Sequence, residues 1–162
     1  MTYPAKVIIS NWSHYFEDIS FSSDDFYLTI KQLVESRKFP DVSVRQINLL
    51  QGTWLLAERQ YLRVRRRRLI FDICAAPYGT GFFVSWWLGE NPSALRILFR
   101  SIPIIGLLIR EIPKRTYFQM DTDNMFRNGV HQSVLTAIDE MTNAKGLRLL
   151  SDFDRKPENN RK

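Results

Sequence analysis

The middle of the chain contains strand-like segments separated by turns too short to allow a crossover. Gln51-Gly52 and Pro77-Tyr78-Gly79 are typical turn sequences, and another turn is expected at Arg66-Arg67. A parallel pair of strands would need a connection of a dozen or more residues, so consecutive strands must pair antiparallel. The sequence therefore predicts an antiparallel β-meander with strands at residues 42–44, 54–65, 69–75 and 81–88.

Two amphipathic segments predict helices. The first begins at Ser22, where Ser or Asp side chains can cap the free N–H groups, and ends before Pro40. The second runs from about Asn124 to about Ala144, with its apolar residues on one arc. Residues 116–120 fit a fifth strand. The predicted fold class is α+β: an antiparallel meander of four to five strands, two main helices packed on one face, and a short helical apolar insertion.

Length and composition predict one domain. The chain has 162 residues, and we assign residues 1–150 to a single α+β domain with an apolar basic insertion at about 91–113. We expect residues 151–162 to be a mobile polar tail. The first residues lack a secretory pattern, and the single cysteine, Cys74, has no internal disulfide partner. A cytoplasmic location is expected, with a peripheral one at the inner face of a membrane as the alternative.

The net charge of +6 is concentrated in two segments. Residues 51–89 carry six arginines against Glu58 and Asp72, for a net +4, and residues 91–115 carry another +4. The remainder is slightly acidic. A basic excess this localised indicates an anionic partner, such as nucleic acid, lipid headgroups or an acidic protein face.

Alternation along the strand that precedes Arg66 places four side chains in one row. Arg59, Tyr61, Arg63 and Arg65 are two residues apart and share one sheet face, while Leu62 and Val64 point to the core. With the turn at Arg66-Arg67, Arg65 would lie opposite Arg68 and Arg63 opposite Ile70. Guanidinium groups bind phosphate and carboxylate groups through paired hydrogen bonds, and Tyr61 could stack on a base. The alternative is a solvated face that prevents edge pairing. The predicted anion-binding residues are Arg59, Arg63, Arg65, Arg66, Arg67 and Arg68.

The second basic segment is also apolar. Its uncharged stretches are far shorter than the roughly 20 residues that a membrane-spanning helix needs. It could close over the core, form a protein interface or lie on an anionic membrane. In the preceding strand, Trp86 and Trp87 must point to opposite faces, so one ring should be buried and the other displayed. The predicted partner or membrane contacts are Tyr61, Trp86, Trp87, Leu98, Phe99, Ile105 and Leu108.

Residues that could support catalysis are few. Cys74 lies in an apolar strand and is interpreted as a packed core residue, although Arg59 could favour its thiolate. His14 and His131 have no second ligand at zinc spacing, so no metal site, cofactor or small-molecule ligand is predicted. Gly79-Thr80-Gly81 leads into a strand, so it lacks the helix N-terminus of a phosphate-binding loop.

These observations favour a non-enzymatic interaction module over an enzyme. We expect the chain to dock through the arginines of residues 59–68 and the apolar segment at about 91–113. The partner would be another protein, a second copy of the chain or an anionic membrane surface. The alternative is a nucleic-acid-binding accessory protein that uses the arginines for phosphate contacts.

Overall fold

The computed structural model describes residues 7–50, 58–91, 116–146 and 149–159 of the chain. The predicted contact residues of the apolar insertion, Leu98, Phe99, Ile105 and Leu108, lie outside these residues. The first four residues of the strand predicted at 54–65 also lie outside them. The elements, in chain order, are β1 (Val7–Phe16), α1 (Ser23–Ser36), β2 (Val42–Leu50), β3 (Glu58–Arg66), β4 (Leu69–Tyr78), β5 (Gly81–Glu90), α4 (Tyr117–Ala144) and β6 (Glu158–Asn159).

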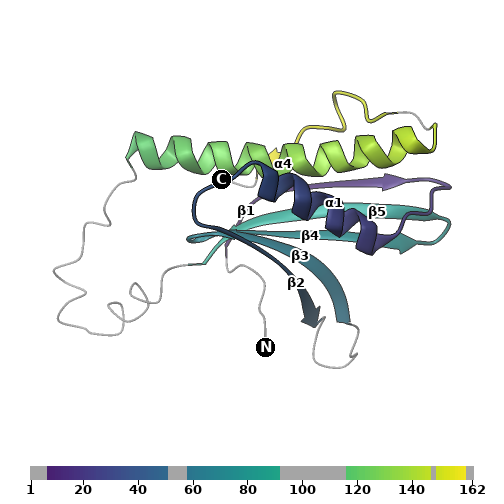
Figure 1. Cartoon of the computed structure of the whole chain (residues 1–162), viewed down its shortest axis with the longest axis horizontal. Helices are drawn as coiled ribbons and strands as arrows, with labels where there is room; N and C mark the ends of the chain where they lie inside the picture. The colour runs from purple at the N-terminus through teal and green to yellow at the C-terminus, as the bar shows by residue number, and fades with distance from the viewer. Residues whose placement is uncertain (1–6, 51–57, 92–115, 147–148, 160–162) are drawn as a thin grey trace.

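The strands form one antiparallel sheet in the order β2-β3-β4-β5-β1-β6. Strands β2 to β5 follow one another as a meander, and β1 returns to pair with β5, so that Trp12 lies opposite Trp86. Helices α1 and α4 lie over the same face of the sheet (Figure 1). The predicted α+β fold, with its antiparallel meander and two helices, is confirmed.

Local capping explains where the two helices begin. The Ser22 side chain accepts a hydrogen bond from the Asp25 N–H, as the sequence predicted for the first helix. Helix α4 begins earlier than expected, because Thr116 and Gln119 form a capping box with reciprocal bonds. The strand predicted at residues 116–120 is therefore wrong: in the structure this segment is the first turn of α4.

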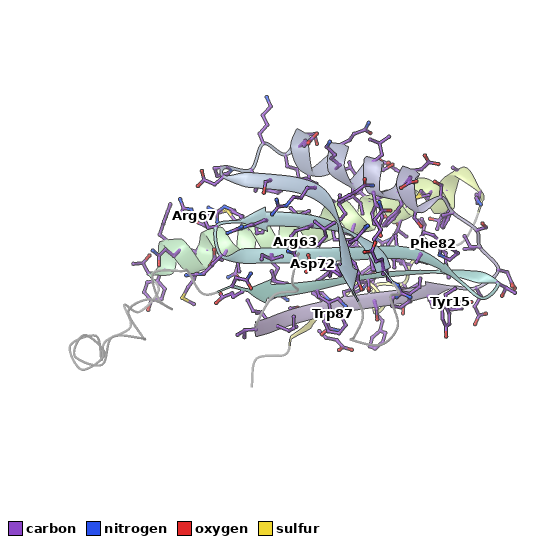
Figure 2. The ribbon with its side chains drawn as sticks, turned by 90° about the horizontal axis from the view of Figure 1, so that it is seen from below. Tyr15, Arg63, Arg67, Asp72, Phe82 and Trp87 are labelled. Carbon is purple, nitrogen blue, oxygen red and sulfur yellow. The ribbon has the colours of Figure 1, made fainter. Side chains whose placement is uncertain are left out.

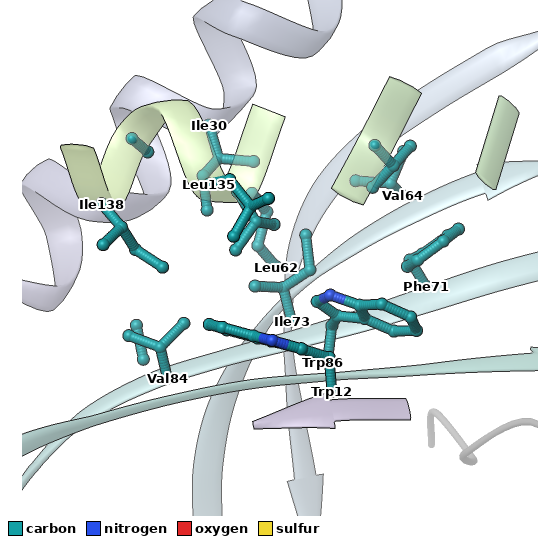
Figure 3. Close-up of a cluster of buried hydrophobic side chains, with 14 of the residues drawn as sticks. Trp12, Ile30, Leu62, Val64, Phe71, Ile73, Val84, Trp86, Leu135 and Ile138 are labelled. Carbon is teal, nitrogen blue, oxygen red and sulfur yellow. The ribbon is translucent and has the colours of Figure 1, made fainter. Parts of the chain in front are cut away.

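The core lies between the sheet and the two helices. The strands contribute Trp12, Ile73 and Trp86 among others, and α4 covers them with Leu135 and Ile138 (Figure 3). All five side chains are at most 3% exposed. Burying a large apolar side chain contributes about 1.5–3 kcal/mol, so this layer dominates the stability of the fold.

The β3–β4 hairpin turns one residue later than the sequence predicted. Arg66 pairs with Leu69, so the turn is Arg67-Arg68 and each residue of β3 meets a partner two positions further along β4. Arg67 adopts a left-handed conformation with φ of 51°, which an ordinary L-residue adopts at a cost. A run of four arginines, residues 65–68, offers no Gly or Asn to mark the turn, which explains the error.

Residues 149–159, most of which were expected to be too polar to pack, lie against β1 and α4. The Trp12 indole N–H donates to the Asp154 carbonyl at 2.5 Å, and Arg155 forms two bonds with the Asp139 carboxylate at 2.7 and 3.1 Å. Leu150 is buried, and the two-residue strand β6 pairs with β1. Side-chain bonds to backbone carbonyls thus fix a segment that has little apolar surface of its own.

Candidate functional site

One face of the sheet points away from α1 and α4, and we call it the open face. It carries the predicted row of Arg59, Tyr61, Arg63 and Arg65. Cross-strand register aligns Arg45, Arg63, Asp72, Trp87 and Asn11 in one row across five strands. Figure 2 shows Arg63 and Asp72 on neighbouring strands, with Tyr15 toward one end of the sheet and Arg67 toward the other. The described residues of this face, by register, are Ile8, Asn11, Ser13, Tyr15, Ser43, Arg45, Ile47, Leu49, Arg59, Tyr61, Arg63, Arg65, Ile70, Asp72, Cys74, Ala76, Tyr78, Gly81, Phe83, Ser85, Trp87, Gly89 and Glu158.

Arg63 and Asp72 form a buried ion pair at the centre of the open face. The Arg63 Nε lies 2.6 Å from Asp72 Oδ1, and its NH2 nitrogen lies 2.8 Å from Oδ2. Each residue is 4% exposed. The sequence predicted Ile70 opposite Arg63, and the displaced turn brings Asp72 there instead. Because Asp72 already neutralises it, Arg63 is a structural cation rather than a free anion-binding group.

Three other arginines of the open face are exposed to solvent: Arg45, Arg59 and Arg65. Within the described ranges, none of them forms an ion pair with an acid. The Arg65 Nε donates to the Arg67 carbonyl at 3.1 Å, which leaves its terminal nitrogens for other partners. Sequence reasoning missed Arg45, because the predicted second strand ended at Val44 and did not place it beside Arg63.

The three arginines of the turn hold the hairpin to other elements. Arg66 is buried, donates to the Pro40 carbonyl at 3.2 Å and lies 3.6 Å from the Asp123 carboxylate. Arg68 contacts the same carboxylate at 2.6 Å. Arg67 remains exposed and pairs with Asp41 at 3.1 Å. Arg66 and Arg68 therefore fasten the turn to the first turns of α4, a role that the sequence did not predict for them.

The tryptophan pair divides as predicted. Trp86 is fully buried on the helix side, and Trp87 on the open face is 43% exposed. Tyr15, which is 39% exposed, and the half-exposed Phe83 lie further along the same face. Tyr15 was missed because nothing local in residues 7–16 shows that this segment pairs with β5, whereas Phe83 was overlooked although its alternation with Trp87 in the predicted strand 81–88 places both on one face. Tyr61 is half-buried beside the exposed arginines.

Cys74 lies in β4 on the open face, close to Arg59 of the neighbouring strand β3, and is 1% exposed. Burial raises the pKa of its thiol, and this effect outweighs the nearby Arg59 guanidinium, which lowers the pKa by its charge and a hydrogen bond. Burial likewise raises the pKa of the Tyr61 hydroxyl. A thiol that is protonated and covered is a poor nucleophile, which agrees with the interpretation of Cys74 as a packed residue.

The two histidines lie on the helix side of the sheet, so neither can serve Cys74 as a base. His131 Nδ1 accepts a hydrogen bond from the Trp86 indole at 3.1 Å, and its Nε2 lies 2.7 Å from the Arg155 carbonyl. The imidazole is therefore neutral, with its proton on Nε2, and burial lowers its pKa. His14 pairs with Val84 on that side. Cys74 and the two histidines therefore do not form a Cys–His pair.

No group of three His, Cys, Asp or Glu side chains in the described ranges is placed to hold a metal ion. None of the described helices is long and apolar enough to cross a membrane. Comparison with known proteins found no matching family model, no matching curated protein and no matching solved structure. The open face, with its exposed arginines and tryptophan, is the candidate site.

Proposed function

We propose that this chain is a non-enzymatic interaction module whose open face binds an acidic surface of a partner protein. The observation that supports this most directly is the charge of that face. Arg45, Arg59 and Arg65 are exposed on β2 and β3, whereas the acids on the described part of the face are Asp72, which is bound to Arg63, and Glu158, which lies beside Asn11 at the opposite edge of the sheet. An excess of unpaired positive charge next to an exposed Trp87 favours a partner that brings carboxylates.

The choice of residues favours a protein over a membrane or a nucleic acid. Every cation on the described open face is arginine, and the described lysines lie elsewhere. Arg, Trp and Tyr are enriched at the energetic centres of protein interfaces, whereas Lys is depleted there. Membrane and phosphate-backbone surfaces use lysine as readily as arginine. The predicted contribution of the apolar segment at 91–113 is part of this proposal and remains a prediction.

A pull-down with charge-reversed baits tests the proposal. Tagged chain is incubated with an extract of its native host, with and without the triple substitution Arg45→Glu, Arg59→Glu and Arg65→Glu, and bound proteins are identified by mass spectrometry. A matched control carries the same charge change at exposed sites elsewhere: Lys31→Glu, Lys38→Glu and Lys156→Glu.

We expect proteins with acidic segments to be retained by the unaltered chain and by the control, and lost from the open-face variant. Equal loss in both triple variants would show that only the overall charge matters, and would contradict the proposal. Anionic liposomes and single-stranded RNA are tested in parallel with the same three baits. Retention of either, specifically lost with the open-face variant, would instead support the membrane or the nucleic-acid function.

A further inference from the structure

Strand β2 ends the sheet on one side, and none of the described residues pairs with its outer edge. It is nine residues long, and its register with β3 runs without a bulge from Val42 to Leu50. The opposite edge is different, because there the two-residue strand β6 covers part of β1. A long edge strand exposes a row of backbone N–H and C=O groups that can pair with another strand.

Proteins usually protect such an edge with lysine, proline, a bulge or a very short strand. The sequence of β2 contains no proline and no lysine, and its one charged residue is Arg45. On the helix side of β2, Val42 and Val44 are half-buried at the border of the core. The edge thus combines backbone groups that no described residue pairs with, the half-buried Val42 and Val44 on the helix side, and Arg45 with Ile47 and Leu49 on the open face.

We infer that the partner binds by adding an extended, acidic strand to the outer edge of β2. This inference rests on the proposed function, since it takes the partner to be an acidic protein, and it specifies how that partner is recognised. Main-chain hydrogen bonds to β2 would supply affinity, and alternate side chains would supply specificity. A carboxylate on the open face would lie beside Arg45, and apolar side chains on the other face would extend the strip of Val42 and Val44.

Charge argues against a second copy of this chain as the occupant. The described open face carries four arginines, Arg45, Arg59, Arg63 and Arg65, all on β2 and β3, against Asp72 and, at the far edge of the sheet, Glu158. Pairing two β2 edges would join two such faces into one continuous sheet surface, and like charges would repel. An acidic strand has the complementary charge.

The geometry of a sheet separates edge binding from binding across the open face. Neighbouring strands lie about 5 Å apart, so an added strand would lie about 5 Å from β2 and about 10 Å from β3. Arg45 belongs to β2, whereas Arg59 and Arg65 belong to β3. Edge addition therefore predicts that Arg45 matters more than the other two arginines, and a ligand spread over the face would depend on all three alike.

The test uses a defined probe, the capped octapeptide acetyl-(Val-Glu)4-amide, titrated into the isotope-labelled chain and followed by amide NMR and hydrogen exchange. A second peptide with lysine in place of glutamate is the charge control. Two further versions carry N-methyl groups on the four valines or on the four glutamates, which removes the N–H donors from one edge of the probe or the other. Single variants Arg45→Glu, Arg59→Glu and Arg65→Glu each change the charge equally.

We expect the acidic peptide to slow amide exchange along β2, and the lysine peptide to have no effect. At least one N-methylated version should bind about tenfold more weakly or worse, because several ladder hydrogen bonds are lost. Arg45→Glu should weaken binding more than Arg59→Glu or Arg65→Glu.

Three results would overturn the inference. Equal binding by all the acidic peptides, with equal losses from the three variants, would exclude edge addition while leaving the proposed acidic docking face intact. Binding unchanged by every arginine variant would contradict the proposed function itself. A chain that dimerises without peptide, with its β2 amides already protected, would identify the occupant as a second copy.

Discussion

Removing Arg63 alone should destabilise the fold severely, because it would leave the Asp72 carboxylate buried without its partner. Both residues are 4% exposed, and their two hydrogen bonds measure 2.6 and 2.8 Å. Breaking such a pair from one side costs about 3–5 kcal/mol, which is a large part of the roughly 5–15 kcal/mol that holds a domain together. We therefore expect Arg63→Met to lower the free energy of unfolding by about that amount.

The cost should nearly disappear when both charges are removed. In the double variant Arg63→Met with Asp72→Leu, neither charge of the described pair is left in the buried site, so the unfolding free energy should return to within about 1 kcal/mol of the unaltered chain. Exposed Arg65 on the same strand provides the control, because Arg65→Met should change stability by less than about 0.5 kcal/mol.

Urea unfolding followed by tryptophan fluorescence measures all four chains. With a urea slope of about 2 kcal/mol/M, the Arg63→Met midpoint should fall by roughly 2 M, with the slope itself unchanged. The reasoning is refuted if the double variant is no more stable than Arg63→Met, since removing the Asp72 carboxylate would then have recovered none of the lost stability. A loss no larger than that of Arg65→Met would refute it equally.

Three further predictions concern the turn, a histidine and a glycine. Arg67→Gly should raise the unfolding free energy by about 0.5–1 kcal/mol in urea titration, because glycine accepts the φ of 51° and the exposed pair with Asp41 contributes little. Because the pKa of His131 is lowered in the folded chain, the unfolded chain binds more protons below the usual value of 6.5, so stability should fall as the pH drops below 6.5. Unfolding measured from about pH 8 to about pH 5 should show this fall, and His131→Gln should flatten it; an unchanged slope would assign it to other groups. Gly81→Ala should lower the thermal midpoint, since its new Cβ would lie 2.2 Å from the Phe16 carbonyl oxygen, a clash worth at least about 2 kcal/mol.

Local patterns in the sequence were sufficient for the meander and for the faces of its strands. Alternation placed Arg59, Tyr61, Arg63 and Arg65 on one face, and that assignment survived a wrong turn because shifting the turn does not change which residues alternate. The register itself depended on which arginine took the left-handed conformation, and Arg67 carries no signal for it.

Long-range pairing explains what sequence reasoning missed at the site. Asn11 and Tyr15 belong to the open face only because β1 pairs with β5, and no local pattern specifies that partnership. The same holds for residues 149–159, where Asp154 and Arg155 bind through backbone carbonyls that any sequence possesses. The start of α4 was a different kind of error, since the capping box at Thr116 and Gln119 was present in the sequence and was not recognised.

The position of β1 beside β5 has a consequence for how the chain is made. Residues 7–16 are synthesised before their partner strand, which is complete only when Glu90 has been added. Until then residues 7–16 have no complete strand to pair with. Helix α1 and the meander, by contrast, can form from contacts between near neighbours in sequence. We therefore expect β1 to dock late and to control the attachment of residues 149–159, which bind to Ser10 and Trp12. The two ends of the described chain would then join the fold together, as the final step that closes it.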